Sequence, residues 1–350
     1  MKRKKTTMDH VQRFFNRLYK NLERTAGMRL HHTKKDDLPD IDRMNRIMDV
    51  FYKNPCLKIH DKENISIVNF ESSDNVKIEA LVYKPNPDSK KWIIGSHWFG
   101  GHKYWSLYHA LILTKMGYNV IAYDFRNHGN SGKSPVTMGA TEHLDFLATL
   151  NWLMENEKEI DSLGIMGTSM GAYVTEYNNI INADLLRSVN LKFAIADVPY
   201  GSIETLFWKV KNQYLKLIPK KMAKKRINKL IDKLNKNNNV DLRASNLIEK
   251  LEIDKLVPAA PTLFLHGKYD AVTPVTDSYD LYIFSEKLIP GNEIYTFNNS
   301  SHTQSTRLNF ETQSQLILNF VNGFEDSKID LQPILDFFEI KNPIENRNRI

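Results

Sequence analysis

Residues 167–171 read G-T-S-M-G, and this G-x-S-x-G pattern constrains the fold more than any other part of the chain. The apolar run 163–166 precedes it, and a run compatible with a helix begins at Ala172. The order is therefore strand, sharp turn, helix. Such a turn strains the backbone of Ser169 and lifts its hydroxyl clear of the sheet, while the glycines let strand and helix approach each other. The pattern predicts a nucleophilic Ser169, with the N–H of Met170 directed at a developing oxyanion.

A serine hydroxyl needs a base, and the base needs an orienting carboxylate. Both occur downstream. The apolar strand 262–265 runs into a turn that ends in Asp270, and a polar loop after the strand-like residues 293–297 carries His302. We therefore predict Asp270 as the acid and His302 as the base. Asp197, which ends the sixth predicted strand, remains a rival for the role of the acid.

A second oxyanion donor is expected upstream of the serine. The predicted strand 92–97 is followed by W-F-G-G-H, residues 98–102. Gly100 and Gly101 allow unusual backbone dihedrals there, so this loop can present a backbone N–H to the site.

With these motifs the chain resembles the α/β-hydrolase family, specifically its bacterial serine esterase or lipase-like branch with a helical cap. The resemblance extends over residues 65–323. Its motifs are H-W-F-G-G at 97–101, where the family usually has H-G-x-x-G, D-F-R-N-H-G-N-S-G at 124–132, the elbow at Ser169, H-G-K-Y-D at 266–270 and S-H at 301–302. The resemblance assigns the second oxyanion N–H to Phe99. The chain departs from the family at Trp98, which replaces a glycine, so this loop is expected to be shaped differently.

The order of apolar segments predicts an α/β fold. After an opening pair, 65–70 and 76–83, helical patterns separate most of the later strands. This alternation indicates a mostly parallel central sheet with helices on both faces, and catalytic groups at the carboxyl ends of its strands. The later strands are expected at 92–96, 119–123, 163–166, 192–196, 262–265 and 293–297.

Three segments are expected, in chain order. A basic N-terminal arm spans 1–50, an α/β-hydrolase domain spans 51–325, and a tail spans 326–350, with a short docking helix over 331–338. Residues 200–257 interrupt the alternation with two helical apolar stripes separated by Pro219. The resemblance identifies this insertion as the helical cap. Most of its apolar residues must bury one another and the edge of the sheet, and some are candidates for lining an acyl pocket. Its lysine-rich stretch, 220–236, is either a solvated face or a surface that attracts anions.

Positive charge is concentrated in the arm. Residues 1–35 hold eleven Lys or Arg and two Asp or Glu, a net +9, whereas the whole chain carries +7. Apolar residues between Val11 and Leu22 follow helical spacing, which predicts a basic amphipathic helix. Three interpretations remain: the helix packs on the domain, it binds an anionic membrane surface, or it binds nucleic acid. The last is disfavoured because no nucleic-acid module accompanies the charge.

Composition limits the other classes of function. The single cysteine, Cys56, excludes an intrachain disulfide, and the histidines show no metal-ligand spacing. No apolar run reaches the ~18 residues of a membrane span, and no apolar stretch follows the basic N-terminus as in a secretory signal. The expected location is the cytoplasm, with peripheral contact at the inner face of the membrane as an alternative.

The expected function is hydrolysis of a carboxylic ester, from a small-molecule or lipid-derived substrate, through an acyl-enzyme on Ser169 and without cofactor or metal. Two alternatives remain. One is a peptidase or thioesterase that uses the same site, and the other is an inactive scaffold that binds a membrane or a partner protein.

Overall fold

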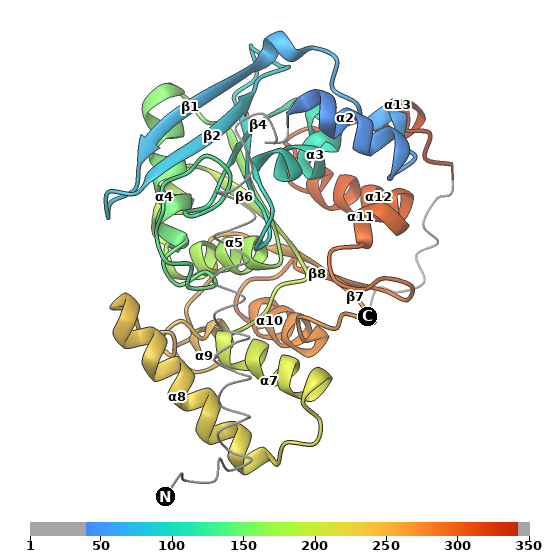
Figure 1. Ribbon diagram of the computed structural model, residues 1–350. Helices are drawn as coiled ribbons and strands as arrows, with labels where there is room; N and C mark the ends of the chain where they lie inside the picture. Colours follow the sequence, from blue (N-terminus) through green and yellow to red (C-terminus); the bar gives the residue numbers. More distant parts are fainter. Residues whose placement is uncertain (1–39, 342–350) are drawn as a thin grey trace, which may run out of the picture.

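An eight-stranded sheet runs through the molecule in the order β1-β2-β4-β3-β5-β6-β7-β8 (Figure 1). The computed structural model describes residues 40–341. β1 pairs with β2 and β2 with β4 in antiparallel fashion, and the remaining neighbours are parallel. The prediction of a mostly parallel sheet is therefore confirmed. The strands are β1 (Ile65–Glu71), β2 (Lys77–Tyr83), β3 (Lys91–Ser96), β4 (Tyr118–Tyr123), β5 (Ser162–Thr168), β6 (Leu191–Asp197), β7 (Thr262–Gly267) and β8 (Glu293–Phe297).

Helices cover both faces of this sheet (Figure 1). The central strand β4 shows why. Its side chains alternate between two buried clusters, with Val120 and Ala122 in one and Ile121 and Tyr123 in the other. A strand buried on both faces needs apolar residues at every position rather than at every second one. The helices packed around the sheet are α2 (Ile41–Val50), α3 (Lys103–Thr114), α4 (His143–Asn156), α5 (Met170–Ile181), α6 (Ala183–Ser188), α9 (Leu247–Glu252), α10 (Val275–Leu288), α11 (Ser305–Leu308), α12 (Phe310–Asn322) and α13 (Gln332–Phe337).

The two ends of the described chain pack on the same face of the sheet. α2 is capped by Asp40 and buries Ile41, Met44 and Met48 in the cluster that also receives α3 and α12. These ten residues of the predicted arm therefore pack against the α/β domain, while the predicted amphipathic stretch lies outside the described residues. α13 buries Ile334 in the same cluster, which confirms the short docking helix predicted over 331–338.

Three helices lie between β6 and β7, and two of them, α7 (Ile203–Tyr214) and α8 (Lys220–Asn238), form the projecting part of the insertion. The third, α9, buries Leu247 and Leu251 in a cluster of the main domain. α7 and α8 lie at the end of the molecule opposite β1 (Figure 1). Ile203 of α7 packs with Ile227, Ile231 and Leu234 of α8 in a small separate core. The expectation that most residues of the apolar stripes are buried is confirmed, with Leu206 packed in a cluster of the main domain, but Tyr214 and Leu217 at the end of the first stripe are exposed.

The base of the cap is fixed to α10 by one carboxyl group. Asp277 Oδ2 accepts hydrogen bonds from the Gly201 N–H at 2.8 Å and from the Thr205 hydroxyl at 2.6 Å. Ser202 and Thr205 also form a reciprocal capping box at the start of α7.

Over residues 40–341, no helix is both long and apolar enough to cross a membrane.

Candidate active site

Ser169 lies in a strained turn between β5 and α5. Its φ is 56° and its ψ is −114°, which is a left-handed conformation that residues with a Cβ rarely adopt. The flanking glycines are required by close contacts. A Cβ on Gly167 would overlap the backbone of Gly171, and a Cβ on Gly171 would overlap the carbonyl oxygen of Ser96. The sequence motif therefore has the predicted geometry of a nucleophile elbow.

The elbow is fixed through the backbone of Ser169 and leaves the hydroxyl free. Its N–H donates to the Asp197 carbonyl oxygen at 2.8 Å, and its own carbonyl accepts the Tyr173 N–H at 2.9 Å. Within residues 40–341 the Ser169 hydroxyl has no hydrogen-bond partner, and the Met170 N–H at the first position of α5 has no acceptor.

His302 and Asp270 form a direct hydrogen bond. The His302 Nδ1 to Asp270 Oδ2 distance is 2.7 Å, although the two residues are 32 positions apart. An ionised carboxylate can only accept, so the shared proton is on Nδ1, and in the neutral imidazole the lone pair is then on Nε2. The His302 side chain is 19% exposed and that of Asp270 is fully buried. The arrangement leaves Nε2 available as a proton acceptor.

Asp270 is held in place by its own turn. Its Oδ1 accepts the N–H groups of Val272 and Thr273 at 2.7 and 2.8 Å, and its Oδ2 accepts the Thr273 hydroxyl at 2.9 Å. Burial alone would raise the pKa of Asp270, but the His302 hydrogen bond, the nearby imidazoles and the Val272 N–H together bring it below the usual value. The carboxylate therefore stays ionised at neutral pH.

Asp197, the rival acid, lies at the end of β6 with a different environment. It is 2% exposed, and its Oδ1 has no hydrogen-bond partner among the described residues. Burial, followed by the negative charge of Asp270, raises the pKa of Asp197 to about 7. The structure thus joins His302 to Asp270, the acid preferred from the sequence.

The loop after β3 folds back on itself next to the elbow. Gly100 has a φ of 85°, the Gly101 N–H donates to the Trp98 carbonyl at 2.8 Å, and the Gly100 N–H donates to His128 Nε2 at 3.0 Å. The Phe99 N–H has no acceptor within the described part of the chain. Phe99 and Met170 are therefore both available for the oxyanion roles predicted from the sequence.

Two buried neutral histidines organise this loop. Burial lowers the pKa of His97 to about 4 and that of His128 to about 3. His97 Nε2 can therefore accept the Phe125 N–H at 3.1 Å, while its Nδ1 donates to the Trp98 carbonyl at 2.7 Å. These contacts agree with the prediction that the two histidines organise loops and do no chemistry.

The acidic and basic residues of the 124–132 loop also brace it. The buried Asp124 accepts both the backbone N–H and the ammonium group of Lys103, at 2.7 and 2.6 Å. Arg126 is nearly fully buried and pairs with Asp145 and Asp74. These buried pairs brace the loop, as predicted for Asp124 and Arg126.

The reason for a tryptophan at position 98 was not evident from the sequence. Its ring packs against Trp105 and His109 of α3, with centroid distances of 5.2 and 5.7 Å. His109 Nδ1 also lies 3.2 Å from the Thr168 hydroxyl, next to the elbow. Trp105 and His109 are spaced i, i+4 on one face of α3, which was the available signal for this cluster.

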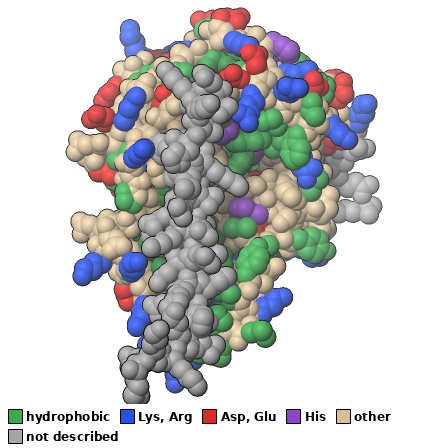
Figure 2. Space-filling model, viewed as in Figure 1, with side chains coloured by type: hydrophobic (Ala, Val, Ile, Leu, Met, Phe, Trp, Pro, Cys, Tyr) green, Lys and Arg blue, Asp and Glu red, His purple; other side chains and the backbone are tan. Residues whose placement is uncertain are grey.

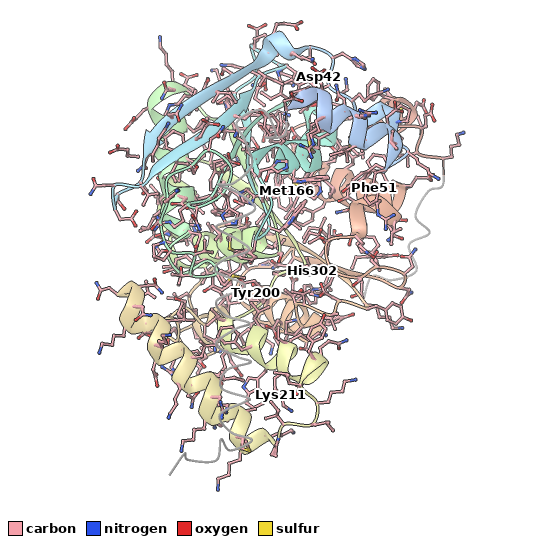
Figure 3. All side chains as sticks on the ribbon, in the orientation of Figure 1. Asp42, Phe51, Met166, Tyr200, Lys211 and His302 are labelled. Carbon is pink, nitrogen blue, oxygen red and sulfur yellow. The ribbon has the colours of Figure 1, made fainter. Side chains whose placement is uncertain are left out.

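The site lies where the sheet meets the cap. In Figure 3, His302 lies between the strands and α7, which carries Lys211. The parallel order β5-β6-β7-β8 brings the carboxyl ends of these strands to one edge, so Ser169, Asp197, Asp270 and His302 share that edge. Over the described ranges, no group of three or more His, Cys, Asp or Glu side chains is placed to hold a metal ion.

Several solved structures share this fold. An esterase of Pyrococcus furiosus, Pf2001, superposes with a TM-score of 0.58 at 20% identity, covering 76% of this chain and 96% of its own. An acylaminoacyl peptidase of Pyrococcus horikoshii gives 0.55 at 18% identity, covering 77% of this chain and 44% of its own. Est1E of Butyrivibrio proteoclasticus, solved with ferulic acid bound, gives 0.53 at 15% identity over 73% of this chain and 98% of its own.

Sequence comparison identifies the family. The chain is 28% identical over 227 residues to the uncharacterized protein YqkD of Bacillus subtilis, covering 63% of this chain and 68% of that protein. The profile of the X-Pro dipeptidyl-peptidase family, S15, matches residues 74–304, a span that begins before β2 and ends just after His302. Because this span is about two thirds of the chain and holds the motifs above, the protein is an α/β hydrolase that belongs to the S15 family.

Proposed function

We propose that this protein is a serine hydrolase that cleaves carboxylic esters through an acyl-enzyme. One observation carries the proposal. The His302–Asp270 hydrogen bond of 2.7 Å lies at the same sheet edge as a serine in a strained left-handed turn. Strain at a turn persists only where surrounding structure enforces it, and it concentrates at functional sites.

In the proposed reaction, His302 Nε2 removes the proton of Ser169 as its oxygen attacks the ester carbonyl. The N–H groups of Met170 and Phe99 hold the oxyanion, and Asp270 stabilises the imidazolium. The imidazolium then gives its proton to the leaving alcohol. A water molecule, deprotonated by the same histidine, attacks the acyl-enzyme, releases the acid and regenerates the serine.

The charges around the serine favour an ester over a peptide with a free N-terminus. A dipeptidyl-peptidase must bind an ammonium group, which an ionised carboxylate does best. At the ends of β6 and β7 the carboxyl groups are Asp197 and Asp270. Asp270 is engaged by His302, and Asp197 is buried with its pKa raised to about 7 by that burial and by Asp270. Both carboxyl groups are buried, and Asp270 is already engaged by His302.

The family match supports a second candidate, a peptidase acting on X-Pro bonds. A thioesterase would use the same groups. The experiment compares p-nitrophenyl esters of increasing acyl length with Ala-Pro-p-nitroanilide and an acyl thioester, with Ser169→Ala as the background control. The proposal predicts the highest kcat/KM for one of the esters. A higher kcat/KM for the Ala-Pro anilide would assign the protein to the peptidases instead.

A further inference from the structure

The tip of the cap exposes apolar side chains to solvent. α7 ends at Tyr214 and α8 begins at Lys220, and residues 215–219 connect them. Leu217 in this connection is 99% exposed and Tyr214 is 63% exposed. The connection lies at the lower end of the molecule, away from β1 and β2 (Figure 1). Single exposed apolar residues are common, so the surroundings decide whether this one has a role.

The surroundings of Leu217 are strongly basic. Residues 209–238 contain eleven Lys or Arg and a single acidic residue, Asp232, which already pairs with Arg243. Figure 2 shows blue Lys and Arg side chains around the lower end of the molecule, with green hydrophobic side chains among them. Exposed lysines closest in sequence to the tip are Lys216, Lys220, Lys221, Lys224 and Lys225.

These lysines repel one another without internal compensation. Within the part of the chain that the structure describes, no carboxylate lies within ion-pair distance of the five. Lys220 and Lys224, and likewise Lys221 and Lys225, are spaced i, i+4 on α8, where like charges destabilise a helix. An external anionic surface would remove this repulsion.

The exposed apolar side chains and the lysines around them together indicate which kind of surface would bind the tip. A nucleic acid would engage the lysines but would leave Leu217 in water. An anionic bilayer satisfies both, because its headgroups attract the lysines and its interfacial region accepts leucine and tyrosine side chains.

We propose that the α7–α8 tip docks on an anionic lipid surface, with Leu217 and Tyr214 entering the interface and Lys216, Lys220, Lys221, Lys224 and Lys225 facing the headgroups. The inference concerns the cap alone and does not depend on the reaction at Ser169. Docking in this orientation places the cap between the sheet and the membrane.

The test is co-sedimentation of the full-length protein with vesicles of phosphatidylcholine, with and without phosphatidylglycerol. We expect binding to the phosphatidylglycerol vesicles only, and release as salt is raised, because screening weakens exposed charge attraction. The triple substitution Lys220→Gln, Lys221→Gln and Lys224→Gln should weaken binding about 100-fold, at about fivefold for each lysine. Leu217→Ser should weaken it about tenfold or more.

Matched controls separate the tip from general charge and hydrophobicity. Lys77→Gln, Lys133→Gln and Lys158→Gln together remove three exposed charges outside the cap, and Val50→Ser replaces an apolar residue that is 69% exposed. Both controls should bind within about threefold of the wild type. No variant should melt below the wild type, because the substituted side chains are exposed and removing like charges at i, i+4 on α8 relieves repulsion.

Three outcomes would overturn the proposal. In the first, the tip variants bind vesicles as well as the wild type does. The binding would then belong to another part of the chain. The second is control variants that lose as much binding as the tip variants. The third is binding to double-stranded DNA that depends on the lysines while binding to vesicles is absent, which would make the surface a nucleic-acid site.

Discussion

Replacing Asp270 by asparagine should abolish catalysis by changing the tautomer of His302. Oδ1 of Asp270 accepts two backbone N–H groups, from Val272 and Thr273. The amide oxygen of an asparagine must therefore occupy that position, because an NH₂ group cannot accept a hydrogen bond. The NH₂ group then faces His302 Nδ1, which becomes an acceptor, and the imidazole proton moves to Nε2. A protonated Nε2 cannot remove the serine proton.

The expected loss is large. In the serine-protease template the same exchange costs about 10⁴ in kcat for this reason, which corresponds to about 5.4 kcal/mol of activation free energy. Asp197→Asn is the matched control, because it makes the same chemical change at the neighbouring strand end. Since Asp197 makes no hydrogen bond to His302, its variant should stay within about tenfold of the wild type.

The assay is kcat and kcat/KM for p-nitrophenyl acetate, measured for both variants with Ser169→Ala as background and with melting curves as a check of folding. A folded Asp270→Asn variant with near wild-type turnover would refute the tautomer argument. So would a larger loss in Asp197→Asn than in Asp270→Asn, which would move the acid to β6.

The remaining predictions concern stability and cofactors. The pKa of Asp197 is raised on folding by burial and by Asp270, so its proton is kept where the unfolded chain, with a carboxyl pKa near 3.9, has lost it. This group therefore lowers stability as pH rises from about 4 to about 7, and Asp197→Asn should raise the free energy of unfolding by more than about 1 kcal/mol at pH 8 but not at pH 4. Urea unfolding at the two pH values checks this, and an equal gain at both would contradict it. Gly171→Ala should cost about 3 kcal/mol or more, because the added Cβ overlaps the Ser96 carbonyl, and an unchanged melting temperature would show that the elbow is looser than described. EDTA should leave ester turnover unchanged, since the proposed reaction uses no metal, and a loss restored by added Zn²⁺ would contradict this.

Most of the fold could be predicted because strand and helix patterns are local. β8 was predicted with its observed bounds, and the other strands within one or two residues at most ends. The elbow was predictable for a further reason, since steric overlap at Gly167 and Gly171 leaves glycine alone at these positions. To predict that Asp270 pairs with His302, the order of the motifs along the chain was needed as well as the residues within each motif.

Contacts between distant segments could not be predicted from local patterns. The packing of α2 on α3 depends on three-dimensional complementarity, and the sequence of residues 41–50 alone did not separate it from the basic arm. The anchoring of the cap by Asp277 likewise joins residues whose separation in sequence carries no periodic signal.

The central claim is that Ser169 is an activated nucleophile, and a fluorophosphonate probe tests it most directly. The probe reacts with a serine only where a base and an oxyanion site activate it. We expect one phosphonyl group per chain by intact-mass measurement, mapped by peptide sequencing to Ser169, with no labelling and no ester turnover in a folded Ser169→Ala variant. A wild-type protein that is folded yet unlabelled, or labelling that maps to another serine and persists in Ser169→Ala, would contradict the account.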